Sequence, residues 1–482
     1  MQPAKGAREA ASGGPKLGRT MPADDHGATS LQVPATEAEA AFAAASPGSS
    51  WRSREVAALV VVAAGLLACF GWLLGAFDLE SGLRAGQALL HGLSPYSPVT
   101  SPVFKAGHAF VYPYLVAWAF VPLAALPLPA AVGIFLFLSV GAIAAACHLL
   151  GRTGWLPTAL VLSSSTTIVG LQMGTVNALL LLGVAVAWSQ RDRWVLAGSA
   201  VAAAAVAKLF LIPLLAWLVL ARRLRAAALA AGALCVALAA GWTLGPLGAH
   251  AYTAMLGDLQ SREASNSWSL TSFFDSLGAS PGQAELLAIA FAGAIVVAGA
   301  ARARRTGDER NLFSASIIAS LLATPIMWSS YLLVLAAVVL VVATDDRTVA
   351  ALAAASWLVV TPDGASYPRV AVGMAVTGAL AAVAQWHSRR DPRAQVSSGA
   401  WPLPLRLRMA AMGRHALAAS RWLAHDRKVL TAASVVIVTA AILLLVPPAV
   451  RSALPSLLLM VAAAIEVARR TRSSDRAQAE GQ

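Results

Sequence analysis

Two charged side chains stand beside or inside long apolar runs, where a charge costs free energy unless it has a partner or a task. Asp78 follows the apolar run 56–76 by two residues, and Lys208 lies inside the run 194–220. A carboxylate at this depth could take a proton from a membrane-bound hydroxyl group, and a buried ammonium could bind an anion such as a phosphate. Alternatively, Asp78 only ends a helix and Lys208 extends its amine to the interface.

The composition is that of a membrane protein. Of the 482 residues, 58% are hydrophobic and only 12% are charged, which excludes an ordinary soluble protein. The net charge of +13 comes from Arg clusters beside apolar runs, so it orients the chain in a bilayer and does not indicate nucleic-acid binding. Cys69, Cys147 and Cys235 lie in apolar runs without metal-ligand spacing. We therefore predict an all-α, polytopic integral membrane protein.

The apolar runs predict about 11 to 14 transmembrane or re-entrant helices, because several are shorter than a straight span. The runs cover approximately residues 56–76, 112–126, 130–150, 156–169, 176–188, 194–220, 226–244, 284–301, 312–323, 326–343, 349–360, 370–386, 429–446 and 454–468.

Basic residues predict the orientation of these helices. Between residues 389 and 428 they far outnumber acidic ones, which predicts a cytoplasmic side, whereas the polar loops 77–111 and 246–282 are predicted to face outward. The predicted parts are a disordered cytoplasmic tail (1–50), a membrane core (51–390), an Arg-rich cytoplasmic loop (391–427), a further transmembrane hairpin (428–468) and a cytoplasmic tail (469–482). We expect a multi-pass protein of the plasma membrane with a cytoplasmic N-terminus.

The path of the run 194–220 has two interpretations. As a single span it would leave Arg191 and Arg193 on the outer side, against the usual distribution of basic residues. As a hairpin broken near Lys208 it would need a compensating re-entrant pair earlier in the chain, for which 122–129 is a candidate.

Short motifs follow Asp78 in a characteristic order. They are Leu89-Leu90-His91-Gly92 with Tyr96, Tyr112-Pro113, Gly174-Thr175-Val176-Asn177, Lys208 with Pro213, Ser267-Trp268-Ser269-Leu270, and Thr324-Pro325-Ile326-Met327-Trp328. With this order and spacing, residues 56–390 resemble the actinobacterial polyprenol-phosphate-dependent mannosyltransferases, which are C-type membrane glycosyltransferases.

The resemblance implies transfer of a hexose, most often mannose, on the outer face. The donor would be a polyprenyl-phosphate sugar and the acceptor an envelope glycolipid or polysaccharide. Asp78 would be the catalytic base, and a lone carboxylate suits a single, inverting displacement. The candidate substrate-binding residues are the cations Lys208, Lys105, Arg84 and Arg262, together with His108, Tyr112, Asn177, Trp268, Trp328 and Tyr331. We predict no cofactor and no metal site, because His91 and His108 lack a metal-binding motif.

The chain also departs from the family pattern at positions that could contact a sugar or a phosphate. Thr175 and Trp268 replace glutamines, Tyr114 replaces a proline, and residues 329–331 (Ser-Ser-Tyr) replace an Asp/His pair. One alternative is therefore an inactive family member with a structural role. Another is a transporter or flippase of lipid-linked sugars, although such carriers are usually built from repeated halves, and the sequence shows none.

Overall fold

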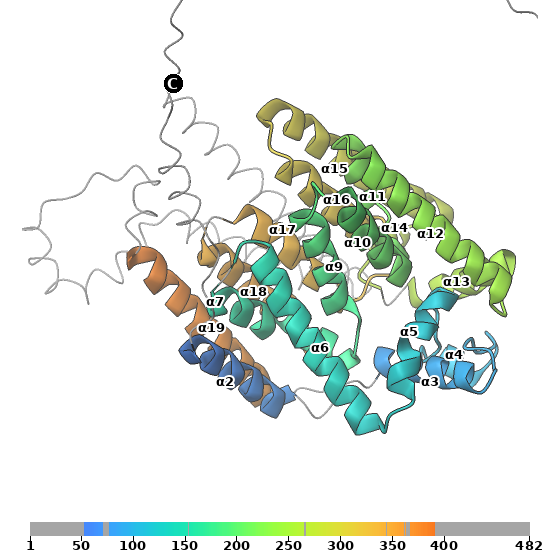
Figure 1. Ribbon diagram of the computed structural model, residues 1–482, viewed down its shortest axis with the longest axis horizontal. Coiled ribbons are helices and arrows are strands. Elements are labelled where there is room, and N and C mark those ends of the chain that lie inside the picture. Colours follow the sequence, from blue (N-terminus) through green and yellow to red (C-terminus); the bar gives the residue numbers. More distant parts are fainter. Residues whose placement is uncertain are drawn as a thin grey trace, which may run out of the picture. The chain divides into compact units, whose positions relative to one another are not determined.

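The computed structural model describes residues 53–70, 77–152, 154–264, 267–343, 345–360, 362 and 367–390 (Figure 1). Every regular element in this part of the chain is helical, which confirms the all-α prediction. The predicted tail 1–50, the Arg-rich loop 391–427, the hairpin 428–468 and the tail 469–482 lie outside the described residues.

The predicted apolar runs 429–446 and 454–468 lie outside the described residues, and the runs up to residue 386 coincide with helices or with pairs of short helices. These are α2 (Ser53–Phe70), α5 (Tyr114–Ala124), α6 (Leu128–Leu149), α7 (Trp155–Ser163), α8 (Ser165–Met173), α9 (Asn177–Ser189), α10 (Trp194–Ala207), η2 (Leu209–Leu211), α11 (Leu214–Leu220), α12 (Leu224–Leu244), α15 (Pro281–Thr306), α16 (Arg310–Leu322), η4 (Ser329–Val334), α17 (Leu335–Val342), α18 (Asp346–Val359) and α19 (Tyr367–Arg390).

Only some of these helices are long enough to cross a bilayer alone. Among the described residues, α6, α12, α15 and the segment Pro368–Gln385 of α19 meet the length and hydropathy of a span. The pair α7–α8 meets them together but is bent by 68°, and the other apolar helices are shorter than the roughly 20 residues that a straight span needs. The chain is therefore a multi-pass membrane protein with several broken helices, which accounts for the short apolar runs.

The breaks have local causes. At Ser164 the backbone is extended (φ −66°, ψ 140°), and the side chain accepts a hydrogen bond from the Thr167 backbone N–H at the start of α8. At Lys208 the backbone is again extended (φ −146°, ψ 113°), and α11 begins only after Pro213, which has no N–H to continue a helix.

The two polar segments predicted as outer loops contain helices. The first forms α3 (Asp78–Leu90) and α4 (Pro102–Lys105), and the second forms α13 (Ala249–Glu263) and α14 (Leu270–Ser276). Helix α3 packs closely on α5, because a Cβ at Gly82 would lie 2.6 Å from the Phe120 ring and one at Gly86 2.9 Å from Ala124 Cβ. Gly82 and Gly86 lie four positions apart on the buried face of this amphipathic helix. Helix α3 has only 13 residues and is too short and too polar to resemble a span.

The two polar segments also share one hydrophobic cluster. Phe104 and Phe110 from the first segment and Tyr252 and Met255 from α13 are buried together, as the proximity of α4 and α13 in Figure 1 indicates. Val176, just before α9, and Val206, near the end of α10, pack against the same cluster. Segments 77–111 and 246–282 therefore lie at the same end of the helices, which is what the prediction that both face outward requires.

A second network joins helix ends at the opposite end of α9 and α10. The Arg223 guanidinium donates to Glu309 (Nε to Oε1 3.0 Å, Nη2 to Oε2 2.9 Å) and to Asp192 Oδ1 (3.0 Å). Glu309 also accepts from Trp217 Nε1 at 2.9 Å and pairs with Arg191 at 3.7 Å. We call Arg191, Asp192, Arg223 and Glu309 the anchor network.

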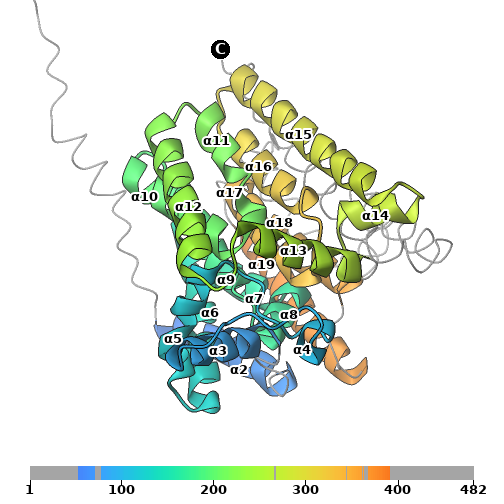
Figure 2. The same cartoon turned by 90° about the vertical axis from the view of Figure 1, so that its right-hand side faces the viewer.

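The anchor network decides between the two interpretations of 194–220. Asp192 precedes α10 and Arg223 follows α11, so both ends of this segment lie together. Helices α10 and α12 start side by side, since a Cβ at Gly198 would lie 2.7 Å from the Ala226 carbonyl oxygen (Figure 2). The segment is therefore a hairpin, and Lys208 lies in the turn farthest from the anchor network.

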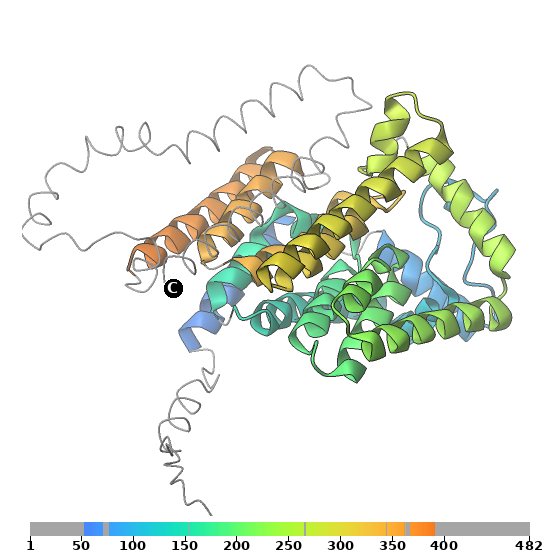
Figure 3. The same ribbon diagram turned by 90° about the horizontal axis from the view of Figure 1, so that it is seen from above.

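The last helices pack around the break between α7 and α8. Helices α18 and α19 run side by side (Figure 3). Trp357 of α18 donates from Nε1 to the Ser163 carbonyl at 2.9 Å, and Thr377 of α19 donates to the same oxygen at 3.0 Å. These bonds supply a carbonyl at the break with partners, which a chain in a membrane cannot obtain from water.

Candidate active site

Asp78 is the first residue of α3, and its carboxylate has a tyrosine partner. The Tyr112 hydroxyl donates to Asp78 Oδ2 at 3.0 Å. Tyr112 comes just before Pro113, which caps α5, so the packing of α3 on α5 brings these two residues together across 34 positions of sequence. A carboxylate with one bound oxygen keeps the other oxygen available for a proton.

Lys208 is buried in the hairpin turn, with only 5% of its surface exposed. Its Nζ lies 3.9 Å from the centre of the Tyr331 ring and 5.6 Å from that of Tyr112. The Phe210 ring stacks on the Tyr331 ring, with centroids 5.0 Å apart. Among the described residues, Nζ has no hydrogen-bond partner, and the opposite charge that acts on it is Asp78.

A group of neutral polar side chains borders this turn. Asn177 Nδ2 donates to Ser330 Oγ at 3.1 Å, and Ser330 directly precedes Tyr331. The Asn177 Oδ1 and Thr175 Oγ1 atoms are buried without a partner in the described part of the chain. Unsatisfied buried groups of this kind are costly, and they are available to a bound hydroxyl group.

The segments around Trp268 and Trp328 are joined through their backbones. The Trp268 N–H donates to the Met327 carbonyl at 2.8 Å, and the Met327 N–H donates to Ser267 Oγ at 2.8 Å. These bonds hold the turn before Ser330 and Tyr331 against α14. Trp328 stays 39% exposed, so its indole is accessible beside the site.

The comparison with known families covers the middle of the chain. The family model of glycosyltransferase family 87 matches residues 110–329, which include Tyr112, Asn177 and Lys208. This region is similar to glycosyltransferase family 87. The match indicates a membrane glycosyltransferase, with a sugar donor and an acceptor as its substrates. No curated protein and no solved structure matches the chain.

Two residues of the site lie outside the matched residues 110–329, which we call the family 87 region. Asp78 precedes the matched residues and Tyr331 follows them by two positions. The hydrogen bond from Tyr112 and the contact with Lys208 join both residues to the matched part. The site is thus formed partly by the family 87 region and partly by its flanks.

The remaining predicted site residues are not brought to Asp78 or Lys208 by any contact in the described residues. Arg84 donates to the His108 carbonyl at 3.0 Å, and the His108 ring stacks on Phe77 with centroids 4.5 Å apart. Arg262 lies 5.9 Å from the Phe104 ring, and Lys105 is exposed at the end of α4. These groups lie on the polar segments 77–111 and 246–282.

Sequence reasoning missed three polar or aromatic groups at or near the site. Ser330 appeared only as a departure from the family pattern, and Phe210 and Gln172 were not singled out. Gln172, at the end of α8, is buried with both amide atoms unpaired among the described residues. An amide only three residues after the apolar run 156–169 is the signal that could have identified it.

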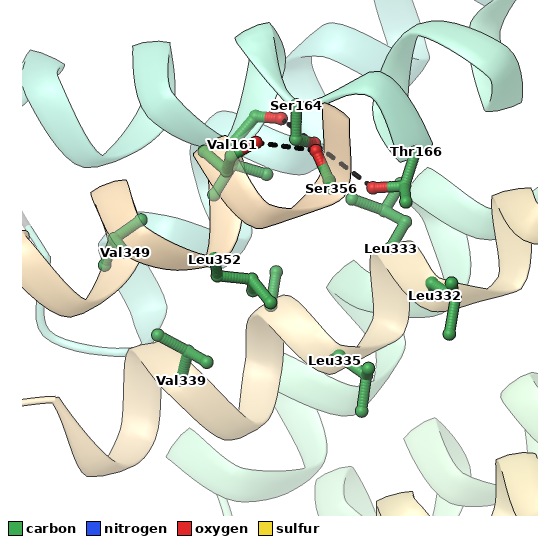
Figure 4. Close-up of a pocket in the computed structure, with 12 residues that line it drawn as sticks. Val161, Ser164, Thr166, Leu332, Leu333, Leu335, Val339, Val349, Leu352 and Ser356 are labelled. Carbon is green, nitrogen blue, oxygen red and sulfur yellow. Dashed lines mark hydrogen bonds between the residues drawn. The ribbon is translucent and has the colours of Figure 1, made fainter. Parts of the chain in front are cut away.

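A small cavity elsewhere among the helices is separate from this site. It lies between α7, η4, α17 and α18 and has a volume of about 20 Å³, and Figure 4 shows the Ser164, Thr166 and Ser356 hydroxyls at one edge of its apolar lining. That volume holds one water molecule and no sugar. The described residues contain no group of three or more His, Cys, Asp or Glu side chains that could hold a metal ion.

Proposed function

We propose that this membrane glycosyltransferase transfers a mannosyl group from a polyprenyl-phosphate donor to an envelope glycolipid or polysaccharide on the outer face, with inversion of the anomeric centre. The observation that carries the proposal is Lys208, a buried ammonium without a hydrogen-bond partner in the described chain and within electrostatic reach of Asp78. In such a pair the cation would stabilise an anionic leaving group, and the carboxylate would act as the base.

The depth of Lys208 supports a lipid-linked phosphate. Helix α10 has 14 residues between the anchor network and Lys208, which corresponds to about 21 Å, whereas the hydrocarbon core is about 30 Å thick. With the anchor network at the cytoplasmic surface, Nζ would lie below the outer surface. A phosphate on a membrane-embedded chain reaches this level, whereas a water-soluble nucleotide sugar would have to leave water.

The proposed reaction is a direct displacement. The acceptor hydroxyl oxygen attacks the anomeric carbon while its proton passes to the Asp78 carboxylate. The bond from the anomeric carbon to the phosphate oxygen breaks, and its electron pair stays on the phosphate, whose charge Lys208 stabilises. One carboxylate and one cation suffice for this step.

The neutral polar groups would bind the sugar. The unpaired Asn177 and Thr175 oxygens can each accept or exchange a hydrogen bond with sugar hydroxyls, and Trp328 and Trp268 offer aromatic faces near the same turn. Arg84, Arg262, Lys105 and His108 lie on the outer segments, where they would contact the acceptor.

Radiolabelled polyprenyl-phosphate mannose tests this proposal. Membranes with the wild-type protein should transfer label to an endogenous glycolipid or polysaccharide, whereas Asp78→Asn, which removes the base but keeps size and hydrogen bonding, should lower transfer on the order of 100-fold with donor binding retained. Polyprenyl-phosphate glucose and a nucleotide-linked mannose, in parallel, identify the donor. The product's anomeric configuration tests inversion.

Near-normal transfer by Asp78→Asn would contradict the base assignment. Transfer from the nucleotide sugar alone would contradict the lipid donor. Transport of a lipid-linked sugar across vesicles without transfer of label would favour a flippase.

A further inference from the structure

Tyr112 contacts both charged groups of the proposed site. Its hydroxyl donates to Asp78 Oδ2 at 3.0 Å, and its ring lies 5.6 Å from Lys208 Nζ. One side chain therefore contacts both the proposed base and the proposed phosphate-binding cation. In a low dielectric an ammonium and a carboxylate attract each other strongly, so the groups that contact them decide whether they form a direct ion pair.

The outer segments fix the backbone of Tyr112 independently of any substrate. The Tyr96 hydroxyl donates to the Tyr112 carbonyl and the Tyr252 hydroxyl to the Val111 carbonyl, both at 3.0 Å. Burial raises the pKa of both Tyr96 and Tyr252, so both phenols remain protonated donors at neutral pH. Pro113 restricts the following backbone further.

We infer that Tyr112 is a positioning residue for the transfer reaction and not a contact of the sugar. Its hydroxyl holds Asp78 through Oδ2, so that Oδ1, which has no hydrogen bond in the described part of the chain, faces the acceptor hydroxyl. Its ring keeps the Lys208 ammonium apart from that carboxylate and available to the donor phosphate. This inference rests on the proposed function for its role in transfer, but the link between Tyr112 and Asp78 is measurable without it.

Loss of the phenol hydroxyl removes the hydrogen bond that holds the Asp78 carboxylate. Without that bond the carboxylate can rotate about its terminal side-chain bond, so neither oxygen stays directed towards the acceptor. Lys208 and Tyr331, from facing elements, also interact electrostatically with Asp78, and a Tyr112→Phe substitution leaves both unchanged.

The substitution Tyr112→Phe keeps the ring over Lys208 and removes only the hydroxyl. We expect kcat to fall about ten-fold because the carboxylate is no longer held in place, and donor KM to change less than two-fold. The matched control is Tyr252→Phe, which removes a buried hydroxyl from the neighbouring carbonyl. It should leave the hydrogen bond between Tyr112 and Asp78 in place even if the protein becomes less stable.

Replacement of Tyr112 by 3-fluorotyrosine strengthens the hydrogen bond with the fold intact, because a more acidic phenol is a stronger donor. The infrared band of the Asp78 carboxylate should therefore shift in the direction opposite to its shift in Tyr112→Phe. A purely structural role for Tyr112 would predict no shift of this band in either variant, with losses of rate that follow stability.

Infrared spectroscopy of the purified protein separates this inference from the proposed function. The Asp78 carboxylate band, identified by its loss in Asp78→Asn, should change in frequency in Tyr112→Phe and keep its wild-type frequency in Tyr252→Phe, without any substrate. These results in a protein that transfers no mannose would leave the Tyr112 link standing and reject the mannosyl donor. An unchanged Asp78 band in folded Tyr112→Phe would overturn the inference.

Discussion

The burial of Lys208 has a free-energy cost that its neighbours offset only in part. A cation over an aromatic face gains about 0.5–2 kcal/mol, whereas an ammonium without a hydrogen-bonding partner loses several kcal/mol on leaving water. Tyr331 and Tyr112 supply the aromatic faces, and Asp78 supplies the opposite charge. A bound phosphate would supply the missing hydrogen-bond acceptors.

Lys208→Met tests this account. The substitution keeps an apolar stem and removes the charge, so polyprenyl-phosphate sugar should bind at least ten-fold more weakly while the melting temperature in detergent stays the same or rises. Lys105→Met is the matched comparison, since Lys105 is exposed on α4, and its effect on donor affinity should be smaller. Unchanged affinity and turnover in stable Lys208→Met would remove Lys208 from the site.

At this scale the sequence indicated candidate residues but not their partners. Asp78 and Lys208 were singled out because charged groups beside or inside apolar runs need a reason, and Asn177 because its motif resembles that of the family. Their contacts were not, because Tyr112 lies 34 positions from Asp78 and Ser330 lies 153 positions from Asn177. Sequence spacing carries no information about such contacts without the helix packing between them.

The helices themselves were largely predictable, and their breaks were less so. Apolar runs determined where helices occur, since a membrane satisfies backbone groups only within them. The short helices of the polar segments were missed, because α3 has only 13 residues and buries only one face. The hairpin at Lys208 was one of two interpretations. The contact between Asp192 and Arg223 and the packing of α10 on α12 distinguish them.

Close packing of α15 on α16 gives a prediction at the element scale. A Cβ at Gly299 would collide with Ala315, and it would lie 3.1 Å from the Asn311 carbonyl oxygen, whereas nothing lies within 4 Å of a Cβ at Gly293 on the same helix. Gly299→Ala should destabilise by about 1–3 kcal/mol through overpacking, and Gly293→Ala should be neutral or stabilising through helix propensity. Thermal unfolding in detergent compares the two, and equal effects would mean that α15 and α16 separate easily.

For the whole molecule, the contacts between distant segments restrict the orientation in the membrane. The segments 77–111 and 246–282 pack together at one end, and Arg223 and Glu309 meet at the other. Basic residues follow this division, with Arg304 and Arg305 in the last turn of α15 near Glu309. The distribution of charge thus agrees with the helix packing, and it predicts which end is cytoplasmic.

Cysteine labelling of intact cells tests that orientation. In a background without Cys69, Cys147 and Cys235, a membrane-impermeant maleimide should label Thr100→Cys in the first polar segment but not Arg304→Cys on α15 unless the cells are permeabilised. Both positions are exposed, so access and not burial decides the result. Labelling of Arg304→Cys alone in intact cells would reverse the orientation.

The anchor network also sets an order for biosynthesis. Arg223 and Glu309 are 86 residues apart, so at about 5–20 residues per second the ribosome needs several seconds to supply the glutamate after the arginine. During that interval the α10–α11 hairpin, too short to cross the bilayer, has only Asp192 to pair with Arg223. The turn that carries Lys208 therefore reaches its final depth only after α15 and the start of α16 have left the ribosome, and nascent chains that end before Glu309 carry an incomplete site.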